Sequence, residues 1–335
     1  MKIVVMEPLG ISQEKLTLLA QPFIQAGNEF VAYNDRAADV QQLTARIEDA
    51  DVVIMANQPL PGEAVTACKK LKMLSVAFTG VDHVDLAACK AKDILVCNAA
   101  GYSTNAVAEL TFGLAISVIR NIVPCDARCR SCGTKDGLVG FELYGKTFGV
   151  VGTGAIGSRV AMLAKAFGCR VIASSRTEKQ ELKDAGVEYV PLTTLLQTAD
   201  FISLHVPLTE ATKNLIDAKA VAMMKPGAVL LNTSRGPVVD SAAVAAALNE
   251  GRLAGAGIDV FENEPPIAME HPLCGAKNAV LTPHVAFASR EALEKRAEIV
   301  FANISCWLDD KPQNIVTNKN HRNNTSHKTT IHPHT

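Results

Sequence analysis

Aromatic side chains, net charge and long apolar runs are all scarce in this sequence. Only 5% of its 335 residues are aromatic, and 33 Lys and Arg side chains balance 34 Asp and Glu side chains to a net charge of −1. Nucleic-acid-binding surfaces are basic and stack aromatic rings on bases, so this composition argues against such a function. The longest apolar candidate, residues 111–119, is far shorter than the ~20 residues of a bilayer span. We therefore expect neither nucleic acid nor a membrane among the partners.

The sequence also lacks the features of a secreted protein. Its apolar start meets the acid Glu7 too early for a signal peptide. Nine cysteines are an odd number spread over a long chain, which suits free thiols in a reducing compartment better than a disulfide framework. We expect a cytoplasmic protein.

The pattern that is present is an alternation of short apolar runs with helical stretches. With 48% apolar residues, the chain is long enough for about two globular domains. The alternation predicts an α/β fold of doubly wound parallel sheets, and the Val- and Ile-rich runs suit strands buried on both faces. The expected strands are residues 2–6, 29–33, 51–55, 73–77 and 94–96, followed by 147–151, 170–174, 188–190, 201–204, 228–231, 255–259 and 279–281.

The segments between and after the two series have different characters. Residues 105–119 predict an apolar helix that serves equally to bridge domains, to contact a second subunit or to fill a core. Residues 128–140 predict a loop rich in Gly, Cys and charge, and residues 289–308 predict a helix. Residues 317–335 are rich in Asn, Thr, Lys and His, which favours a disordered tail over a metal-binding one.

A glycine pattern follows the strand predicted over residues 147–151. Residues 152–157 form G-x-G-x-x-G and open a helix predicted over residues 155–167. Gly152 permits a tight turn, Gly154 lets the backbone approach a pyrophosphate, and Gly157 lets helix and strand pack closely. The helix N-terminus offers unpaired N–H groups and a partial positive charge to phosphate. This context favours a Rossmann-like dinucleotide site over a purely structural turn.

The next predicted strand leads into Ser175 and Arg176, where an NAD site normally carries an acid. A carboxylate would repel a 2′-phosphate, whereas a hydroxyl and a guanidinium donate hydrogen bonds to it. We therefore favour NADP(H) as the cofactor, with NAD(H) as the alternative.

Three polar residues, Arg235, Glu264 and His284, follow late strands, at the sheet edge where α/β proteins bind ligands. Reduction of a carbonyl by hydride leaves an oxygen that needs a proton, and histidine is the natural donor near neutrality. A carboxylate can orient that imidazole, and a guanidinium can bind a substrate carboxylate through two parallel N–H bonds. The set suggests reduction of a 2-oxo acid, although each residue singly also suits an ordinary polar role.

These segments resemble the D-isomer-specific 2-hydroxyacid dehydrogenase family over about residues 1–316. The likeness is carried by residues 232–240, 257–261, 264–266 and 282–286, and further by residues 80–85 and 205–209. It implies His284 as the general acid/base, Glu264 as its partner and Arg235 as the substrate anchor.

The resemblance also implies the binding residues. Substrate would meet Thr79, Gly80, Val81 and Tyr102, with the N–H groups of Gly80 and Val81 on its carboxylate and with Tyr102 placed as in the D-lactate branch. The cofactor would meet Gly152, Gly154, Ala155, Ile156, Gly157, Ser175, Arg176, His205, Val206, Pro207, Thr212, Thr233, Ser234 and Asp259. Asp259 would contact the nicotinamide amide, and no metal site is expected.

The family organisation implies two Rossmann-like domains with a cleft between them. The substrate domain would comprise residues 1–101 and 290–316, the dinucleotide domain residues 102–289, and residues 317–335 the tail. A homodimer built through the cofactor domains is also implied.

The sequence also leaves other functions open. Cys125, Cys129 and Cys132 have the C-x₃-C-x₂-C spacing of a radical S-adenosylmethionine iron–sulfur site, but the same spacing is one face of a helix. A dinucleotide-sensing, corepressor-like interaction protein would share the fold. A third option is an enzyme of the same fold in which formate or phosphite is the hydride donor. The presence of Glu264 beside His284 argues against that option. Within the family we favour glyoxylate or hydroxypyruvate reduction, with D-3-phosphoglycerate and D-lactate as alternatives.

Overall fold

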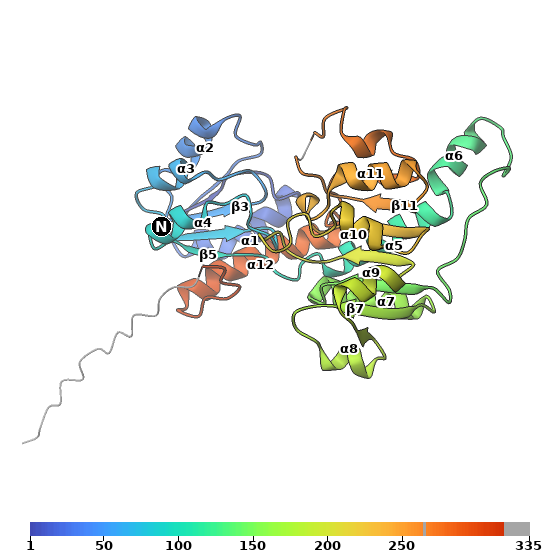
Figure 1. Ribbon diagram of the computed structural model, residues 1–335. Helices are drawn as coiled ribbons and strands as arrows, with labels where there is room; N and C mark the ends of the chain where they lie inside the picture. The colour runs from blue at the N-terminus through green and yellow to red at the C-terminus, as the bar shows by residue number, and fades with distance from the viewer. Residues whose placement is uncertain (264–265, 318–335) are drawn as a thin grey trace, which may run out of the picture. The chain divides into compact units, whose positions relative to one another are not determined.

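The computed structural model describes residues 1–263 and 266–317. The chain divides into two compact units, Met1–Ala99 with Ala297–Thr335, and Ala100–Arg296 (Figure 1). Helix α12 (Arg290–Leu308) begins in the second unit and continues in the first. The tail predicted over residues 317–335 lies, apart from Thr317, outside the described residues.

The first unit is built on a five-stranded parallel sheet of order β2-β1-β3-β4-β5. Its strands are β1 (Lys2–Val5), β2 (Glu29–Ala32), β3 (Val52–Met55), β4 (Met73–Val76) and β5 (Leu95–Cys97). The helices are α1 (Gln13–Gln25), α2 (Val40–Ile47), α3 (Gly62–Ala67), α4 (Leu86–Ala91) and the later part of α12. Phe301 of α12 contacts the rings of Phe23 and Phe30, so α1 and α12 pack together.

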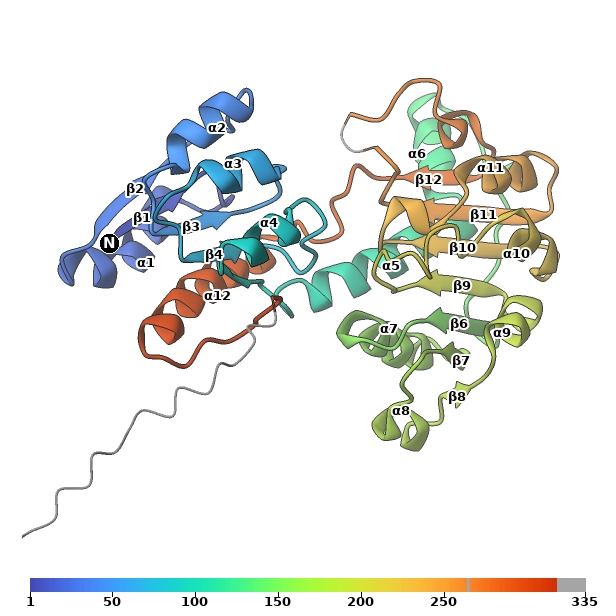
Figure 2. The ribbon, with the colours of Figure 1, turned by 60° about the vertical axis from the view of Figure 1, so that its left-hand side comes forward.

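The second unit contains a seven-stranded parallel sheet of order β12-β11-β10-β9-β6-β7-β8, which Figure 2 shows strand by strand. Its strands are β6 (Thr147–Val151), β7 (Arg170–Ser174), β8 (Glu188–Tyr189), β9 (Phe201–Leu204), β10 (Ala228–Asn232), β11 (Leu253–Ile258) and β12 (Ala279–Leu281). The order reverses between β6 and β9, as in doubly wound dinucleotide-binding folds, and that reversal is where such sheets bind ligands.

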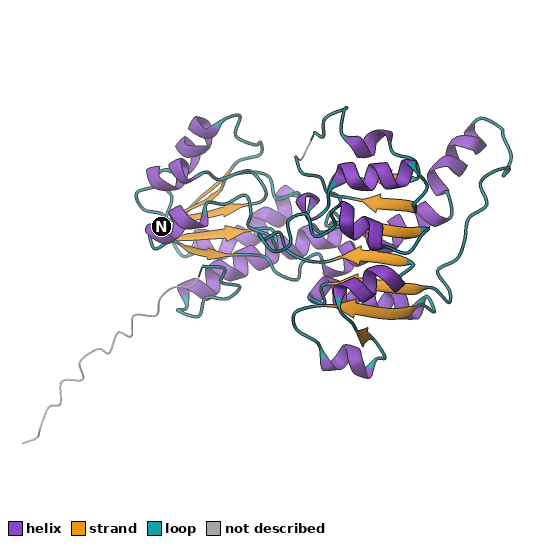
Figure 3. Ribbon diagram, in the orientation of Figure 1, coloured by secondary structure: helices purple, strands orange, loops and turns teal. Residues whose placement is uncertain are grey.

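Helices cover both faces of the second sheet (Figure 3). They are α5 (Thr104–Ile119), α6 (Ile122–Arg130), α7 (Ala155–Ala166), α8 (Gln180–Asp184), α9 (Leu192–Thr198), α10 (Ala218–Met223) and α11 (Ser241–Asn249), with short 3₁₀ turns η1 (Gly236–Val238) and η2 (Pro272–Gly275). Alternate residues of β10 face opposite sides: Val229 and Leu231 lie in the core beneath α5 and α7, and Leu230 lies in the core beneath α9, α10 and α11. Burial on both faces explains why these strands lack polar alternation.

All twelve segments predicted as strands form strands, and the parallel, doubly wound α/β class is confirmed. The apolar helix predicted over residues 105–119 is α5. It lies on two glycines of β11, because a Cβ at Gly255 would come 2.3 Å from Val118 and one at Gly257 would come 2.8 Å from Leu114. Close packing on a sheet therefore accounts for its apolar surface.

The loop predicted over residues 128–140 is wrong at its start, because α6 continues to Arg130. No residue of α6 is buried, so the helix has no apolar stripe that the sequence could reveal. Cys125 and Cys129 lie on α6, whereas Cys132 lies beyond it at φ +57°. Within residues 1–263 and 266–317, no three Cys, His, Asp or Glu side chains gather into a metal-binding group.

No single helix in the described part of the chain has the length and apolarity to cross a membrane. Helices α5 and α6 meet that criterion only together, as a pair bent by 60°.

Candidate active site

The glycine loop lies where the second sheet reverses its strand order. Gly152 follows β6 at φ +90°, and its N–H donates to the carbonyl of Ser174 at the end of β7 (2.8 Å). A Cβ on Gly152 would stand 2.5 Å from the carbonyl oxygen of His205, which follows β9. A Cβ on Gly157 would stand 1.9 Å from the carbonyl oxygen of Gly152. Two of the three glycines are thus required by contacts within the protein.

Gly154 differs, because a Cβ there would meet no protein atom within 4 Å. It is exposed and forms the N-cap of α7, with Ala155 and Ile156 in the first helical turn. The first N–H groups of a helix have no intrahelical acceptor and carry a partial positive charge. An open backbone cradle at a helix N-terminus fits the pyrophosphate of a dinucleotide.

Replacement by alanine should have different effects at Gly157 and at Gly154. Gly157→Ala should lower the free energy of unfolding by about 3 kcal/mol, because backbone must move to admit the methyl group. Gly154→Ala should fold normally but weaken cofactor binding at least tenfold, or about 1.4 kcal/mol. Thermal unfolding and fluorescence titration with the reduced cofactor measure the two effects. Normal cofactor affinity in Gly154→Ala would show that the pyrophosphate does not approach this loop.

The residues beyond β7 form a small polar network. Ser175 Oγ accepts a 3.4 Å hydrogen bond from the N–H of Thr153, and the Tyr189 hydroxyl donates to Thr153 Oγ1 at 3.0 Å. Lys179 Nζ donates to Ser158 Oγ, in the first turns of α7, at 3.0 Å. Arg176 is exposed beside this network. Lys179 therefore places a cation near the helix that is expected to bind phosphate. This lysine was not foreseen from the sequence.

The segment after β9 carries a histidine with a strongly lowered pKa. Burial lowers the pKa of His205 to about 3, so its imidazole is neutral, and its Nε2 lies 2.7 Å from the hydroxyl of buried Ser203. Val206 is half-buried and Pro207 is exposed. Thr212 Oγ1 donates to the carbonyl of Pro207 at 2.6 Å and thereby closes this turn.

The segment after β10 carries Arg235 on a loop shaped by Asn232. Asn232 is buried; its Nδ2 donates to the carbonyl of Arg235 (2.9 Å), and its Oδ1 accepts from the N–H (3.0 Å) and hydroxyl (2.8 Å) of Ser234. Thr233 Oγ1 lies 3.1 Å from Thr111 Oγ1 on α5. Arg235 itself is half-buried. The part of Asn232 in holding this loop was not foreseen from the sequence.

Asp259, after β11, holds the loop that carries His284. Its fully buried carboxylate accepts from Thr282 Oγ1 (2.5 Å) and from the N–H groups of Val285 and Ala286 (both 2.9 Å). Burial raises the pKa of Asp259, and these hydrogen bonds oppose that rise. The N–H of His284 donates to the backbone carbonyl of Asp259 at 2.8 Å.

The Asp259 backbone also connects this loop with the Arg235 loop. Its N–H donates at 2.9 Å to the carbonyl of Asn232, the last residue of β10, so Asp259 bonds both to the strand end from which the Arg235 loop starts and to the His284 loop. A Cβ on Gly236 would lie 1.9 Å from the Phe261 carbonyl carbon, which shows how closely the two segments pack. His284 has φ +53°, a conformation that costs a non-glycine residue about 1–3 kcal/mol and that clusters at functional sites. Arg235 and His284 thus lie on adjoining loops at one edge of the sheet.

Tyr102 belongs to the same group of side chains. Its ring lies 6.4 Å from that of Phe287, which makes an edge contact with the His284 ring at 5.6 Å. Burial raises the pKa of Tyr102 to about 12, so the phenol stays neutral, and Arg296 and Ser103 form hydrogen bonds with it. Phe287 and Arg296, whose guanidinium lies 5.5 Å from the Phe287 ring centre, were not foreseen from the sequence.

Two parts of the predicted site are not among the side chains that the structure describes around His284: Glu264, and the substrate-binding residues 79–81. Glu264 lies outside the described residues, so its pairing with His284 stays a prediction. The flanking Pro266 and Ile267 line, with Phe261 and His284, a cavity of about 350 Å³. Thr79, Gly80 and Val81 lie in the first unit, on the loop after β4.

A reversed-order parallel sheet, a glycine cradle at a helix N-terminus, and a histidine and an arginine on adjoining loops define a dinucleotide-dependent oxidoreductase of the α/β class. Comparison with known proteins supports this class of enzyme. Residues 112–286 match the domain described as "D-isomer specific 2-hydroxyacid dehydrogenase, NAD binding domain".

Similar proteins cover most of the chain. A glyoxylate reductase of Thermococcus litoralis is 41% identical over 285 residues, which are 82% of this chain and 86% of that protein. A hydroxypyruvate reductase of Blautia hydrogenotrophica is 32% identical over 327 residues, 94% and 99% of the two chains. An acyclic imino acid reductase, solved in complex with NADPH and D-Arg, superposes with a TM-score of 0.85 at 31% identity, over 95% of this chain and 100% of that one.

The chain belongs to the D-isomer-specific 2-hydroxyacid dehydrogenase family. It is an enzyme that transfers hydride between a nicotinamide cofactor and a 2-oxo or 2-hydroxy acid, as the sequence predicts. The similar proteins do not favour the alternative of a dinucleotide-sensing interaction protein.

Proposed function

We propose that this enzyme reduces small 2-oxo acids of the glyoxylate and hydroxypyruvate type. The observation that carries the proposal is the junction at Asp259, whose backbone bonds to Asn232, the strand end from which the Arg235 loop starts, and to His284. The similarity to a glyoxylate reductase and a hydroxypyruvate reductase supports the substrate class. A panel of glyoxylate, hydroxypyruvate, pyruvate and 3-phosphohydroxypyruvate, each assayed with NADH and NADPH, tests it. Preference for pyruvate or for the phosphorylated acid would replace our proposed substrate.

In the proposed mechanism, the bound nicotinamide supplies the hydride, and the protein binds the substrate and supplies the proton. Arg235 and the N–H groups of Gly80 and Val81 bind the substrate carboxylate, and Tyr102 borders the substrate. His284 protonates the carbonyl oxygen as it becomes a hydroxyl, with Glu264 as its partner. His205 is unsuited to that task because its imidazole is neutral, with a pKa of about 3. The rigid support of His284 by Asp259 suits a proton donor that must be preorganised.

The cofactor-binding part of the proposal follows the predicted residues. Gly154, Ala155 and Ile156 hold the pyrophosphate on a loop shaped by Gly152 and Gly157, and Val206, Pro207, Thr212, Thr233 and Ser234 line the rest of the cofactor, with Asp259 supporting the loops around it. His205 supports the segment that carries Val206 and Pro207.

We further propose that NADPH is preferred over NADH, because Ser175, Arg176 and Lys179 place donors and cations where an acid would repel a 2′-phosphate. Ser175→Asp should shift the ratio of kcat/KM values from NADPH toward NADH by about a hundredfold, or about 2.7 kcal/mol. Ser175→Ala is the control, because it removes the hydroxyl without adding a charge and should shift the ratio much less. An unchanged ratio in Ser175→Asp would contradict the ribose-site assignment.

We also propose a role for each unit, a homodimer and a cytoplasmic location. The second unit would bind the cofactor, and the first would carry the loop for the substrate carboxylate. A homodimer is supported by the resemblance and by exposed apolar side chains on α6 and the segment after it: Ile122, Val123, Val139, Phe141 and Tyr144. A cytoplasmic location is supported by the nine cysteines, all of which are free thiols.

A further inference from the structure

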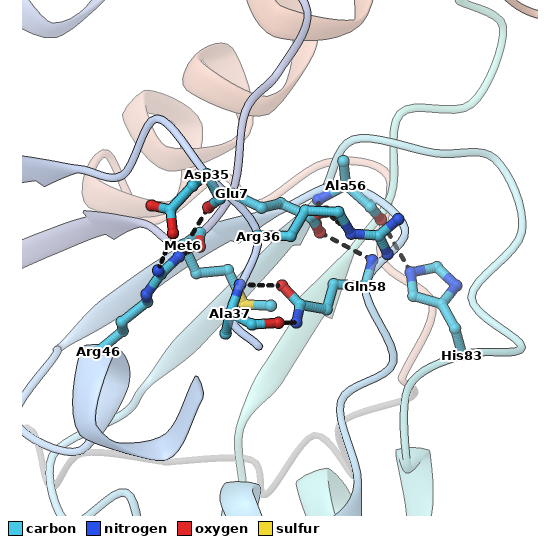
Figure 4. A network of polar contacts seen from close by, with 9 residues as sticks. All are labelled: Met6, Glu7, Asp35, Arg36, Ala37, Arg46, Ala56, Gln58 and His83. Carbon is cyan, nitrogen blue, oxygen red and sulfur yellow. Dashed lines mark hydrogen bonds and ion pairs between the residues drawn. The ribbon is translucent and has the colours of Figure 1, made fainter. Parts of the chain in front are cut away.

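A second polar network lies in the first unit, apart from the residues assigned above (Figure 4). Glu7 follows β1, Ala56 and Gln58 follow β3, and His83 lies on the loop after β4. The strand order reverses between β1 and β3, so the network occupies the carboxyl edge of the sheet at its reversal point. That is the position at which open α/β sheets bind ligands.

Glu7 is the centre of this network. Its side chain is only 2% exposed, and its Oε1 accepts from the N–H of Ala56 (2.8 Å) and from the N–H of Gln58 (2.9 Å). Its Oε2 lies 3.6 Å from Nε of Arg36, whose side chain is half exposed. Hydrogen bonds from N–H groups to a carboxylate are stronger than neutral ones, so Glu7 fixes the turn that follows β3.

A series of hydrogen bonds links that turn to the loop after β4. His83 Nε2 lies 2.9 Å from the carbonyl oxygen of Ala56. The N–H of Leu60 donates to the carbonyl of His83 at 2.8 Å, and the N–H of Asp85 donates to the carbonyl of Leu60 at 3.1 Å. The two segments therefore form one bonded unit, and Glu7 supports it from the end of β1.

The loop after β4 contains Gly80 and Val81. Both are half-buried, and neither donates its N–H to an acceptor in the described part of the chain. Two adjacent N–H donors form a site for a carboxylate only when the loop holds them in one geometry. Their affinity for an anion therefore depends on what fixes the loop.

We propose that Glu7 is a positioning residue for substrate binding: its carboxylate fixes the Ala56–Gln58 turn, which holds the Gly80–Val81 loop in its anion-binding form. This inference rests on the proposed function, in which that loop binds the substrate carboxylate. It assigns Glu7 an effect on KM for the 2-oxo acid and none on the chemistry at His284.

The test compares Glu7→Leu with Glu7→Gln. Leucine offers no acceptor, so KM for glyoxylate should rise about tenfold, which corresponds to about 1.4 kcal/mol. The turnover number and the Kd for the reduced cofactor should stay within about twofold of the wild-type values. Glutamine can offer one amide oxygen to the same two N–H groups, so Glu7→Gln should restore KM to within about twofold. Hydrogen exchange in residues 56–60 and 79–85 should rise together in Glu7→Leu and return to the wild-type level in Glu7→Gln.

Asp51→Ala is the matched control. Asp51 Oδ2 accepts from the N–H of Lys2 (2.9 Å) at the amino edge of the same sheet, so its loss weakens the unit without touching the loop. Its KM should equal that of the wild type. Arg36→Gln removes only the charge beside Glu7 and should also leave KM unchanged.

His83→Phe serves if Glu7→Leu does not fold. It keeps a ring against Phe78, 6.3 Å away at 75°, but loses the bond to Ala56, so KM should rise severalfold. An unchanged KM in a folded Glu7→Leu, or in His83→Phe, overturns the inference. So does an equal rise in Asp51→Ala, or a Glu7→Gln as impaired as Glu7→Leu. If the wild-type enzyme still reduces 2-oxo acids, any of these results overturns only the role of Glu7 and leaves the proposed function intact. If the wild-type enzyme reduces no 2-oxo acid, both the role of Glu7 and the proposed function are overturned.

Discussion

His284→Ala should lower kcat for 2-oxo acid reduction by about a thousandfold, the scale of a lost general acid. The structure explains why little else should change. The His284 backbone is held by its own N–H bond to Asp259, and the Asp259 carboxylate accepts hydrogen bonds from Thr282, Val285 and Ala286 on the same loop. The loop should therefore keep its shape when the ring is removed.

Stopped-flow and steady-state kinetics, with cofactor titration alongside, measure this effect. The Kd for the reduced cofactor should stay within about threefold, and imidazole added to the buffer should restore part of the lost rate, because the ring leaves space at its own position. His271→Gln is the control: His271 bonds to Glu262 at 2.9 Å and has no assigned part in the reaction. Full turnover in His284→Ala would assign the proton to another group.

Arg235→Ala should lower kcat/KM by about a thousandfold, because each hydrogen bond to a charged group contributes about 1.5–3 kcal/mol and the guanidinium can form two. Arg235→Lys should recover only part of this loss, since a lysine ammonium is a single point charge without the planar fork. The side-chain amide of Asn232 bonds to the backbone of Ser234 and Arg235 and remains in place when the guanidinium is removed, so stability should change little.

Kinetics with glyoxylate, thermal unfolding and cofactor titration separate these effects. Arg290→Ala is the matched control, because Arg290 is an exposed arginine at the start of α12 in the same unit. A kcat/KM for Arg235→Lys equal to the wild-type value would mean that two parallel bonds to the substrate carboxylate are not formed.

Several parts of the site were visible in the sequence because each depends on a short stretch of chain. The glycine loop is a local turn between a strand and a helix, and only glycine tolerates the contacts at positions 152 and 157. Arg235 and His284 could be placed at one edge because each closely follows a buried strand, and parallel strands end at the same side of a sheet.

Other parts depend on segments far apart in the chain. Asp259 bonds to residues 23–27 positions away and to Asn232, and Glu7 bonds to residues about fifty positions away. Such pairs form only after the strand order is set, and no local pattern of apolar residues encodes them. Helix α6 was missed for a related reason, because it buries no residue and so has no periodic stripe.

The amino-acid sequence by itself determined the strands, the doubly wound class, the dinucleotide loop and the family, because these follow from the spacing of apolar residues, glycines and a few polar side chains along the chain. Only the tertiary structure decided which buried carboxylate supports which loop, that His205 is a neutral imidazole, and that Phe287 and Arg296 contact Tyr102. Those facts depend on desolvation and on hydrogen bonds between distant segments, which exist only once the sheets have assembled.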